Sequence, residues 1–518
     1  MEKRVALGYR LPALLFPLLF LFPALPPFVD YPQHVAIAAV LRRLADPASF
    51  AARHYEANLL TYNGLFDELT AALSFLVPVE RAARLVVVGA LELFVLGAFA
   101  LLARQRAPRL SYLLVVPLLP NFTLFWGFTN HLLGLGLGLV FVVTLLEAAG
   151  PRAVPAGRML TAAALGLLLA HTHVLATIVC LLIGGAWVLE ESLREAGSLG
   201  GVLQRVGRAA LVVAPACAFC IYVHLRQFAA HASAYSVPNE SETDPLVCKL
   251  AWFGSRVTGA LRSHADGRLV WGALALAAFA TTLALVALPR GSWHGPRTRV
   301  VVAPAAAMAL AYLLVPGVFV GTHLVYPRLA LPFAVLALGL VRVAVAERLF
   351  EAAAAALAAL TFVQTGHALA RFDATARDLL AVLAAAPADA WVAPVHEGSG
   401  GAFTDEYEPP VLHHVAAYHV ATHDAHAAGL FGNYASLPVR FREPEGPVKH
   451  DWLEANGAPF DATDPYAARF ATRLVLLARP EEPLPTWASA GHVLLARRGR
   501  FALVRTVEPG AAKQSPPN

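Results

Sequence analysis

Hydrophobic stretches of about 20 residues recur along the first 370 residues of the chain, and short polar stretches separate them. A helix needs about this length to cross the hydrocarbon core of a bilayer. The pattern therefore predicts a mainly α fold, a polytopic helical membrane bundle with about eleven transmembrane helices. The predicted spans are residues 11–28, 85–103, 110–125, 129–148, 159–172, 174–190, 209–229, 269–289, 300–320, 326–346 and 349–369.

The composition supports a membrane protein and argues against a nucleic-acid-binding one. Hydrophobic residues make up 58% of the 518 residues, 14% are charged, and the mean hydropathy is +0.58. An ordinary soluble chain has roughly 25% charged residues. The net charge of +5 forms no basic patch, because the arginines are spread over short loops between the spans. We therefore expect the lipid bilayer, and no nucleic acid, among the partners.

The distribution of basic residues between loops predicts the orientation in the membrane. The basic loops are residues 104–109, 151–158, 194–208, 289–299 and 342–348. The short loops that alternate with them, residues 120–130, 171–173 and 321–328, contain Arg328 as their one basic residue. Basic loops stay on the cytoplasmic side. We therefore expect an integral protein of the plasma (inner) membrane with a cytoplasmic N-terminus.

A long first outer loop, residues 30–84, follows the first span. Within it, Val35–Leu44 has the pattern of an amphipathic helix. The apolar segment Leu65–Val77 is short and contains Asp67 and Glu68, which favours an interfacial helix over a membrane crossing. A crossing at this position is the alternative, and it would invert the topology of every later span.

The composition changes after residue 386, which predicts a separate domain. We expect a helical membrane domain over residues 1–370 and a small α/β extracytoplasmic domain over residues 387–518. Segments 389–395, 473–478 and 492–507 have the pattern of strands, the last of them a hairpin turning at Arg498–Gly499. Residues 464–471 resemble a short helix. Because this part of the chain contains no cysteine, it must fold on a core of its own.

On this topology, polar residues that could carry chemistry gather at one membrane surface. They are Asp30, Tyr31, Gln33, His34, Asn130, His131, His171, His173, His323, Tyr326 and Arg328. A collection of acids, imidazoles and one guanidinium at one face of apolar helices indicates a reaction centre at the lipid–water boundary. In particular, we expect Asp30 and Arg328 to share the non-cytosolic rim of one crevice.

Asp30 is the candidate catalytic group. It follows the first span directly, and Pro32 favours an extended conformation of Tyr31, which would end that helix and present the acid. A carboxylate here could accept a proton from an acceptor hydroxyl. The alternative is that Asp30 simply caps the following helix.

Arg328 is the candidate phosphate-binding group. It lies at the start of the tenth predicted span, with His323 and Tyr326 just before it. A guanidinium can bind a phosphate through two parallel hydrogen bonds. The alternative is a snorkelling arginine that merely anchors the helix at the interface.

Several histidines could line a cavity at the same face. His171 and His173 could bind a metal or move protons, or they could hydrogen-bond backbone carbonyls at a helix break. Asn130 and His131 lie on the same side and, with His34, complete the predicted lining.

Other polar groups are weaker candidates. Glu92 lies within a predicted span and is expected to hydrogen-bond a neighbouring helix. The spacing of His419, His423 and His426 would place three imidazoles on one face of a helix, but neither a cysteine nor an acidic pattern accompanies them. We therefore predict no metal site and no certain cofactor, and dependence on a divalent cation stays open.

Together these features resemble the GT-C integral membrane glycosyltransferases, in particular the bacterial branch similar to protein mannosyltransferases and lipid A aminoarabinose transferases. The resemblance covers residues 1–370 and rests on the acid after the first span, the long first outer loop, the span number, the late outer arginine and the outer C-terminal domain. It implies that Asp30 is the general base or binds the acceptor, and that Arg328 binds a polyprenyl-phosphate leaving group. It also implies inversion at the sugar carbon.

The sequence departs from this family in two places. Many members have a pair of acids in the first loop, whereas here Gln33 and His34 follow Asp30. The second outer loop, residues 120–131, has Asn130 and His131 but no carboxylate. Both departures put dependence on a metal in doubt, and they leave room for a non-catalytic relative.

The expected function is that of an inverting glycosyltransferase, transferring a hexosyl or pentosyl group. It would transfer a sugar from a polyprenyl-phosphate donor to a lipid, glycan or protein acceptor of the envelope. A transporter or flippase of envelope precursors is the first alternative, although transporters commonly show internal repeats and none is visible here. A non-catalytic envelope protein is the second.

Overall fold

The fold is known from a computed structural model, which describes residues 2–506 except 152–153, 196–197, 232–243, 288–300, 318–323, 344, 398–400, 429, 431–436, 443–469 and 490–491. The chain forms two compact units. The helical unit consists of Met1–Leu21, Leu60–Leu65 and Val87–His367. The mixed unit consists of Phe22–Leu59, Phe66–Val86 and Ala368–Asn518.

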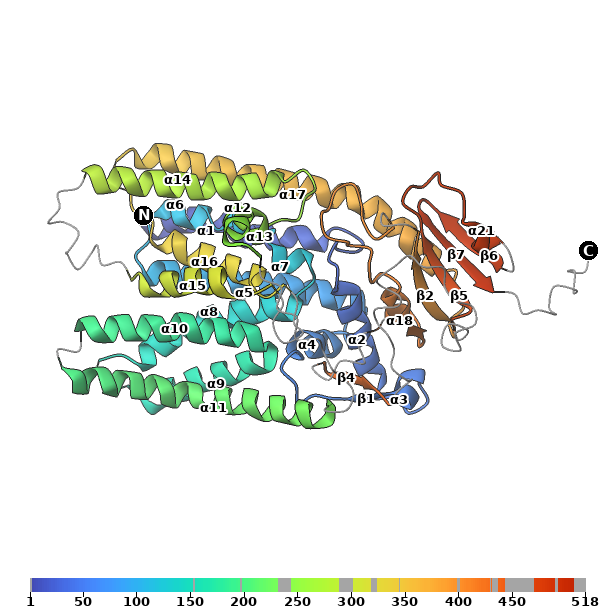
Figure 1. Ribbon diagram of the computed structural model, residues 1–518, viewed down its shortest axis with the longest axis horizontal. Coiled ribbons are helices and arrows are strands. Elements are labelled where there is room, and N and C mark those ends of the chain that lie inside the picture. Colours follow the sequence, from blue (N-terminus) through green and yellow to red (C-terminus); the bar gives the residue numbers. More distant parts are fainter. Residues whose placement is uncertain are drawn as a thin grey trace, which may run out of the picture. The chain divides into compact units, whose positions relative to one another are not determined.

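Apolar helices build the helical unit (Figure 1). Six helices of the described chain are long and apolar enough to cross a membrane: α5 (Val79–Arg104), α8 (Thr129–Ala148), α10 (Val174–Glu195), α11 (Leu199–His231), α14 (Ala265–Ala287) and α17 (Glu347–Leu383). Shorter helical segments accompany them: α1 (Glu2–Leu15), η1 (Phe16–Leu21), α6 (Arg109–Leu113), η2 (Val116–Leu118), α7 (Phe122–Phe125), α9 (Ala156–Thr172), α12 (Leu246–Ala251), α13 (Phe253–Val257), α15 (Ala303–Leu314) and α16 (Pro327–Gly339). Each predicted span overlaps one or more of these helical segments, although residues 22–28 of the first span are not helical and parts of three later spans lie outside the described residues. The predicted helical membrane bundle is confirmed, while the number of crossings stays a prediction.

Glycines bring α8 close to its neighbours. A Cβ atom at Gly138 would lie 2.1 Å from the Cys180 sulfur on α10, and one at Gly136 would lie 2.8 Å from the backbone nitrogen of Phe94 on α5. Small residues of this kind let helix backbones approach closely inside a membrane. Because α9 and α10 both pack on α8, the glycine-rich segment of α8 lies at the centre of the bundle (Figure 1).

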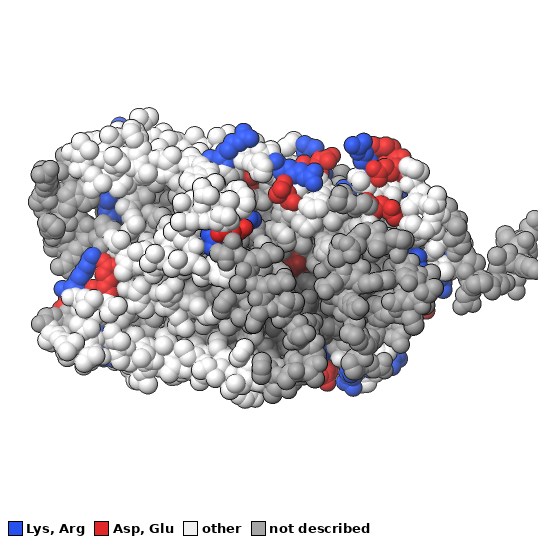
Figure 2. Space-filling view, in the orientation of Figure 1, with Lys and Arg blue, Asp and Glu red and all other residues white. Residues whose placement is uncertain are grey.

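The surface of the helical unit suits a lipid environment. On the face that Figure 2 shows, most of this surface is white, which means that few charged side chains reach it. Large apolar side chains such as Leu160, Leu211 and Phe279 are exposed on α9, α11 and α14. Exposed apolar faces on helices of this length are what a bilayer covers.

The mixed unit contains a five-stranded sheet in the order β3-β2-β5-β7-β6. Its strands are β2 (Trp391–His396), β3 (His426–Ala427), β5 (Thr472–Leu476), β6 (His492–Arg498) and β7 (Phe501–Thr506). β2 is parallel to β3 and β5, whereas β7 is antiparallel to β5 and β6. The three predicted strand segments and the turn at Arg498–Gly499 are thereby confirmed, with Gly499 taking the left-handed conformation (φ 53°) that the turn requires. The predicted helix over residues 464–471 lies almost wholly outside the described residues.

The first loop contributes α2 (Tyr31–Arg43), α3 (Phe50–His54), β1 (Tyr55–Ala57) and most of α4 (Leu65–Leu73) to the mixed unit. Helix α2 packs against α18 (Ala417–Thr422), and β1 pairs antiparallel with β4 (Val439–Phe441) (Figure 1). Helix α4 has nine residues, about 13 Å of length, which is too short to cross a bilayer. The prediction that this segment is not a span is confirmed.

Three local predictions were wrong. Tyr31 is not extended, as Pro32 had suggested, but begins helix α2. Pro32 occupies the first turn of this helix, where its missing N–H costs nothing. The helix is also buried on all sides from Tyr31 to Val40, Gln33 and His34 included, so it is a core helix and not the amphipathic helix that the sequence predicted.

Helix α17 continues to Leu383, beyond residue 369 where the predicted span ends, because apolar residues keep the helical spacing, with Phe372, Ala376 and Leu379 buried. The end of the membrane crossing stays a prediction. The three histidines do not share a helix, because α18 ends at Thr422 and His426 begins β3.

Candidate functional site

Asp30 lies at the N-cap position of α2, but its side chain does not cap the helix. Its backbone carbonyl accepts hydrogen bonds from the N–H groups of Gln33 and His34. The side chain is 18% exposed, and its Oδ1 atom lies 3.4 Å from Nε2 of His414. The alternative role as a simple side-chain cap is therefore not what the structure shows.

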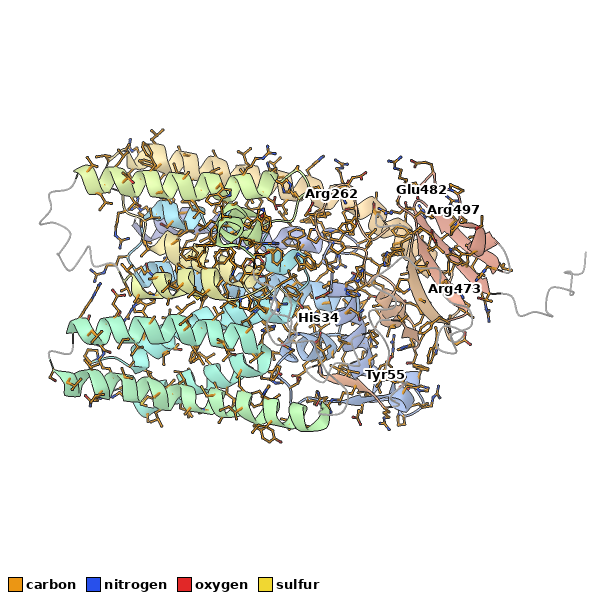
Figure 3. All side chains as sticks on the ribbon, viewed as in Figure 1. His34, Tyr55, Arg262, Arg473, Glu482 and Arg497 are labelled. Atoms are coloured by element: carbon orange, nitrogen blue, oxygen red, sulfur yellow. The ribbon has the colours of Figure 1, made fainter. Side chains whose placement is uncertain are left out.

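His34 forms a buried ion pair one turn further along α2 (Figure 3). Its Nδ1 atom lies 2.8 Å from Oδ1 of Asp67, a residue of α4 with no exposed surface. Burial by itself lowers the pKa of the His34 imidazole, but attraction and hydrogen bonding to Asp67, with a contribution from Asp30, raise the pKa above 6.5. The mixed unit thus places an imidazole that favours the charged form next to the candidate base.

In the helical unit, Arg328 lies in the first turn of α16, stacked on an aromatic ring. Its guanidinium carbon is 3.6 Å from the centre of the Phe128 ring, and its side chain is largely buried, with 8% of the residue exposed. Trp126 in turn stacks on Phe128. A snorkelling arginine would extend its charged end into water. The burial of Arg328 therefore favours a binding role over simple anchoring.

Two of the predicted lining histidines meet beside Arg328. Nδ1 of His131 lies 3.4 Å from Nδ1 of His173. The latter atom accepts hydrogen bonds from the backbone N–H groups of Leu175 and Ala176 at the start of α10, so it has no proton. Nδ1 of His131 therefore faces a ring nitrogen that already accepts from two backbone N–H groups. Its ring also lies close enough to Arg328 to experience the charge of the guanidinium.

His171 and Asn130 hold the segment Leu60–Leu65 in the helical unit. Nδ1 of His171 donates to the carbonyl of Thr61 over 2.8 Å, and Nδ2 of Asn130 donates to the carbonyl of Asn63 over 3.0 Å. The contact of His171 matches the alternative stated for it in the sequence analysis, a hydrogen bond to a backbone carbonyl at a helix break. The two side chains therefore connect a short piece of the first loop to the ends of α8 and α9.

Tyr326 precedes Arg328 and is part of a second polar cluster. Its hydroxyl donates to the carboxylate of Asp244, and Arg256 of α13 lies over its ring. Lys249 of α12 has no exposed surface, and its ammonium group donates to the carbonyls of Leu313 and Val315 at the end of α15. This cluster fixes the backbone that leads into α16 and Arg328.

The predicted site residues thus fall into two sets. Arg328, His131 and His173 meet in the helical unit, while Asp30 and His34 lie on α2 in the mixed unit. The crevice predicted to join Asp30 and Arg328 stays a prediction. His323 lies outside the described residues. Within the part of the chain that the structure describes, no group of three histidine, cysteine or acidic side chains could hold a metal ion.

The sequence analysis missed five charged or titratable residues of these clusters: Asp67, His414, Asp244, Lys249 and Arg256. For Asp67 the signal was present, because an acid in a short apolar helix needs a partner once that helix is buried. A lone lysine in the apolar stretch around Lys249 was a similar signal. For His414, the partner Asp30 lies 384 positions away in the sequence, and no local pattern connects the two.

Sequence comparison finds no matching protein-family model and no matching curated protein. Structure comparison finds a likeness to the crystal structure of ArnT from Cupriavidus metallidurans bound to undecaprenyl phosphate. The TM-score is 0.52 at 12% sequence identity, and the likeness covers 99% of this chain and 98% of the ArnT chain. The fold resemblance drawn from the sequence is thereby confirmed. The chain has the fold of ArnT, and its described part contains six helices long and apolar enough to cross a membrane.

Proposed function

We propose that the chain is an inverting glycosyltransferase that moves a sugar from a polyprenyl-phosphate carrier to an acceptor of the cell envelope. The observation that carries the proposal is the likeness over nearly the whole chain to ArnT, a protein crystallised with undecaprenyl phosphate. Arg328 provides the local support, because a buried guanidinium on an aromatic ring is suited to bind a phosphate.

In this reaction Asp30 orients the acceptor hydroxyl and takes its proton. The hydroxyl oxygen forms the new glycosidic bond as the bond between the sugar carbon and the phosphate oxygen breaks on the opposite face. The electron pair of the broken bond leaves with the phosphate, and Arg328 stabilises the negative charge that develops there. His131 and His173 line the donor site beside Arg328, and Asn130 and His171 hold the segment Leu60–Leu65 next to it.

Tyr326 has a supporting part in this proposal. Because its hydroxyl donates to Asp244, it positions the chain before α16 and leaves the phosphate to Arg328. His323 stays a proposed second donor to the phosphate. The distribution of basic residues supports a plasma (inner) membrane location with a cytoplasmic N-terminus and an extracytoplasmic mixed unit.

The function is tested by profiling lipid-linked sugars in a strain that lacks the gene. We expect a polyprenyl-phosphate sugar to accumulate, and wild-type protein to remove it. Asp30→Asn at normal membrane abundance should leave it in place, whereas the exposed control Asp405→Asn should behave as wild type. An unchanged lipid profile in the deletion strain would count against the proposal, and full rescue by Asp30→Asn would remove Asp30 from the mechanism.

A further inference from the structure

We propose that His414, from the C-terminal part of the chain, positions the Asp30 carboxylate by donating a hydrogen bond from Nε2, and that Gln33 sets the tautomer that makes this possible. The inference rests on the proposed function and adds a positioning residue to it. It assigns to the mixed unit a direct part in the chemistry of the candidate base.

The contacts form a short chain on one side of α2. Nε2 of His414 lies 3.4 Å from Oδ1 of Asp30, and Nδ1 of the same ring lies 3.2 Å from Nε2 of Gln33. Asp30 and Gln33 are three positions apart, so the first turn of α2 presents both side chains to the same ring. Gln33 is 1% exposed, and the His414 side chain is 9% exposed.

The amide of Gln33 determines which ring nitrogen of His414 has the proton. An amide nitrogen can only donate, so Nδ1 of His414 must accept and has no proton. In the neutral ring the proton is then on Nε2, which is the atom that faces Asp30. Gln33 therefore makes His414 a neutral donor to the carboxylate.

This donor fixes the direction of the carboxylate. With Oδ1 held by His414, Oδ2 receives the proton of the acceptor hydroxyl. A neutral donor orients the base without adding a full positive charge, which would stabilise the carboxylate and make it a weaker base.

Other titratable groups surround this pair. His413 lies 4.5 Å from the His414 ring between centroids, and His396 stacks on His413 at 5.6 Å. Burial, together with His413 and His414, lowers the pKa of His396 to about 4. On the α2 side, His34 and its partner Asp67 are the groups next to Asp30. His396 therefore stays neutral, whereas His34, which interacts electrostatically with Asp30, favours its charged form.

Two substitutions of His414 separate a donor from a mere packing role. His414→Gln keeps an N–H at nearly the place of Nε2, and we expect it to retain transfer within about threefold of wild type. His414→Leu removes the donor, and we expect kcat to fall by about 10- to 100-fold with little change in the donor KM. The acidic limb of its pH–rate profile should also move to higher pH, because a carboxylate without its donor binds protons more readily.

A substitution of Gln33 tests the tautomer. Gln33→Glu replaces the group that donates to Nδ1 of His414 by one that accepts. The neutral His414 ring would then have its proton on Nδ1, and the Nε2 atom that faces Asp30 would have none. Only protonated His414 could then donate to Asp30, and we expect a new loss of rate as the pH rises through the range where histidines titrate. His423→Leu, at a histidine of the same segment that contacts Thr422, is the control and should keep the wild-type profile.

The outcomes distinguish this inference from the proposed function. If Asp30→Asn abolishes transfer while His414→Leu and Gln33→Glu keep the wild-type rate and pH profile, the positioning role is wrong and the proposed function stands. Equal losses for His414→Gln and His414→Leu would also overturn the donor role. If wild-type protein transfers no sugar at all, the proposed function fails and this inference fails with it.

Discussion

The environment of Arg328 supports the phosphate-binding role proposed for it over a role as an interfacial anchor. The guanidinium lies on the Phe128 ring and is largely buried, so it is not a solvated anchor. A phosphate is a suitable partner, because it accepts two parallel hydrogen bonds from the planar guanidinium. The first prediction follows from this pairing.

We expect Arg328→Ala to weaken binding of undecaprenyl phosphate by about 10- to 100-fold, the loss of a hydrogen-bonded charge pair. Arg328→Lys should give an intermediate affinity, because an ammonium group keeps the charge but not the paired hydrogen bonds. The measurement is competition binding to purified protein, with undecaprenol, which has no phosphate, as the control ligand. Equal affinity of wild type and Arg328→Ala would contradict the assignment.

His34 and Asp67 make the stability of the mixed unit depend on pH. The pKa of His34 is raised above 6.5 in the folded protein, so the ion pair stabilises the fold fully below about pH 6.5. That stabilisation is lost as the pH rises through the raised pKa, because in this range folding takes up a proton onto His34, and a rising pH opposes that uptake. The second prediction concerns this pH range.

The thermal midpoint of wild type should exceed that of Asp67→Asn by more at about pH 5.5 than at about pH 8.5. His34→Gln should remove the pH dependence of this difference, because it removes the titrating ring. Scanning calorimetry of the purified protein at several pH values measures both. A difference that stays constant, or that grows with rising pH, would show that His34 does not titrate as described.

At the scale of elements, two helix ends hold the first loop to the C-terminal part of the chain. Arg43 at the end of α2 donates to the carbonyls of Val420 and Ala421 in the last turn of α18. Asp424 accepts hydrogen bonds from the N–H groups of Phe50 and Ala51 at the start of α3. Each side chain satisfies backbone groups that a helix end leaves without partners. The first loop and the C-terminal part of the chain therefore stabilise each other's helices.

We expect Asp424→Ala to lower the free energy of unfolding of the mixed unit by about 1–3 kcal/mol, because the start of α3 loses its carboxylate. The exposed Asp389→Ala is the matched control and should cost little. Equilibrium denaturation of the purified protein measures both. A loss no larger than that of the control would mean that solvent replaces Asp424 without cost.

The elements show where sequence reasoning succeeds. Spans such as α8 and α10 were predictable because their hydrophobic stretches are long and continuous, and the β6–β7 hairpin because Gly499 marks its turn. Helix α2 was misassigned because burial on all sides depends on α18, almost 400 positions away in the sequence. His414 was missing from the predicted site for the same reason, because a contact between segments as distant in the sequence as those of Asp30 and His414 leaves no local pattern.

At the scale of the whole molecule, the chain returns from residue 368 onward to complete a unit that its first loop began. Pairing of β1 with β4 and the hydrogen bond between the Tyr55 hydroxyl and His426 add to the helix-end contacts (Figure 3). The sheet has a core of its own, including Val475, Ala502 and Val504. The first loop, by contrast, depends on partners in the C-terminal segment.

A chain that ends after residue 386 should therefore have a first loop that is open to proteolysis. We expect trypsin to cleave after Arg43 much faster in this truncated protein than in the full chain, where the carbonyls of α18 hold its guanidinium. Cleavage in the helical unit, for example after Arg104, serves as the internal control. Equal protection of Arg43 in both proteins would show that the loop folds without the C-terminal segment.

The most direct test of the proposed mechanism measures lipid binding and sugar transfer together in the same purified proteins. Asp30→Asn should bind undecaprenyl phosphate as wild type does but transfer no sugar from a polyprenyl-phosphate donor, because the base acts on the acceptor. Arg328→Ala should lose both binding and transfer. Normal transfer by Asp30→Asn, or normal lipid binding by Arg328→Ala, would contradict the account.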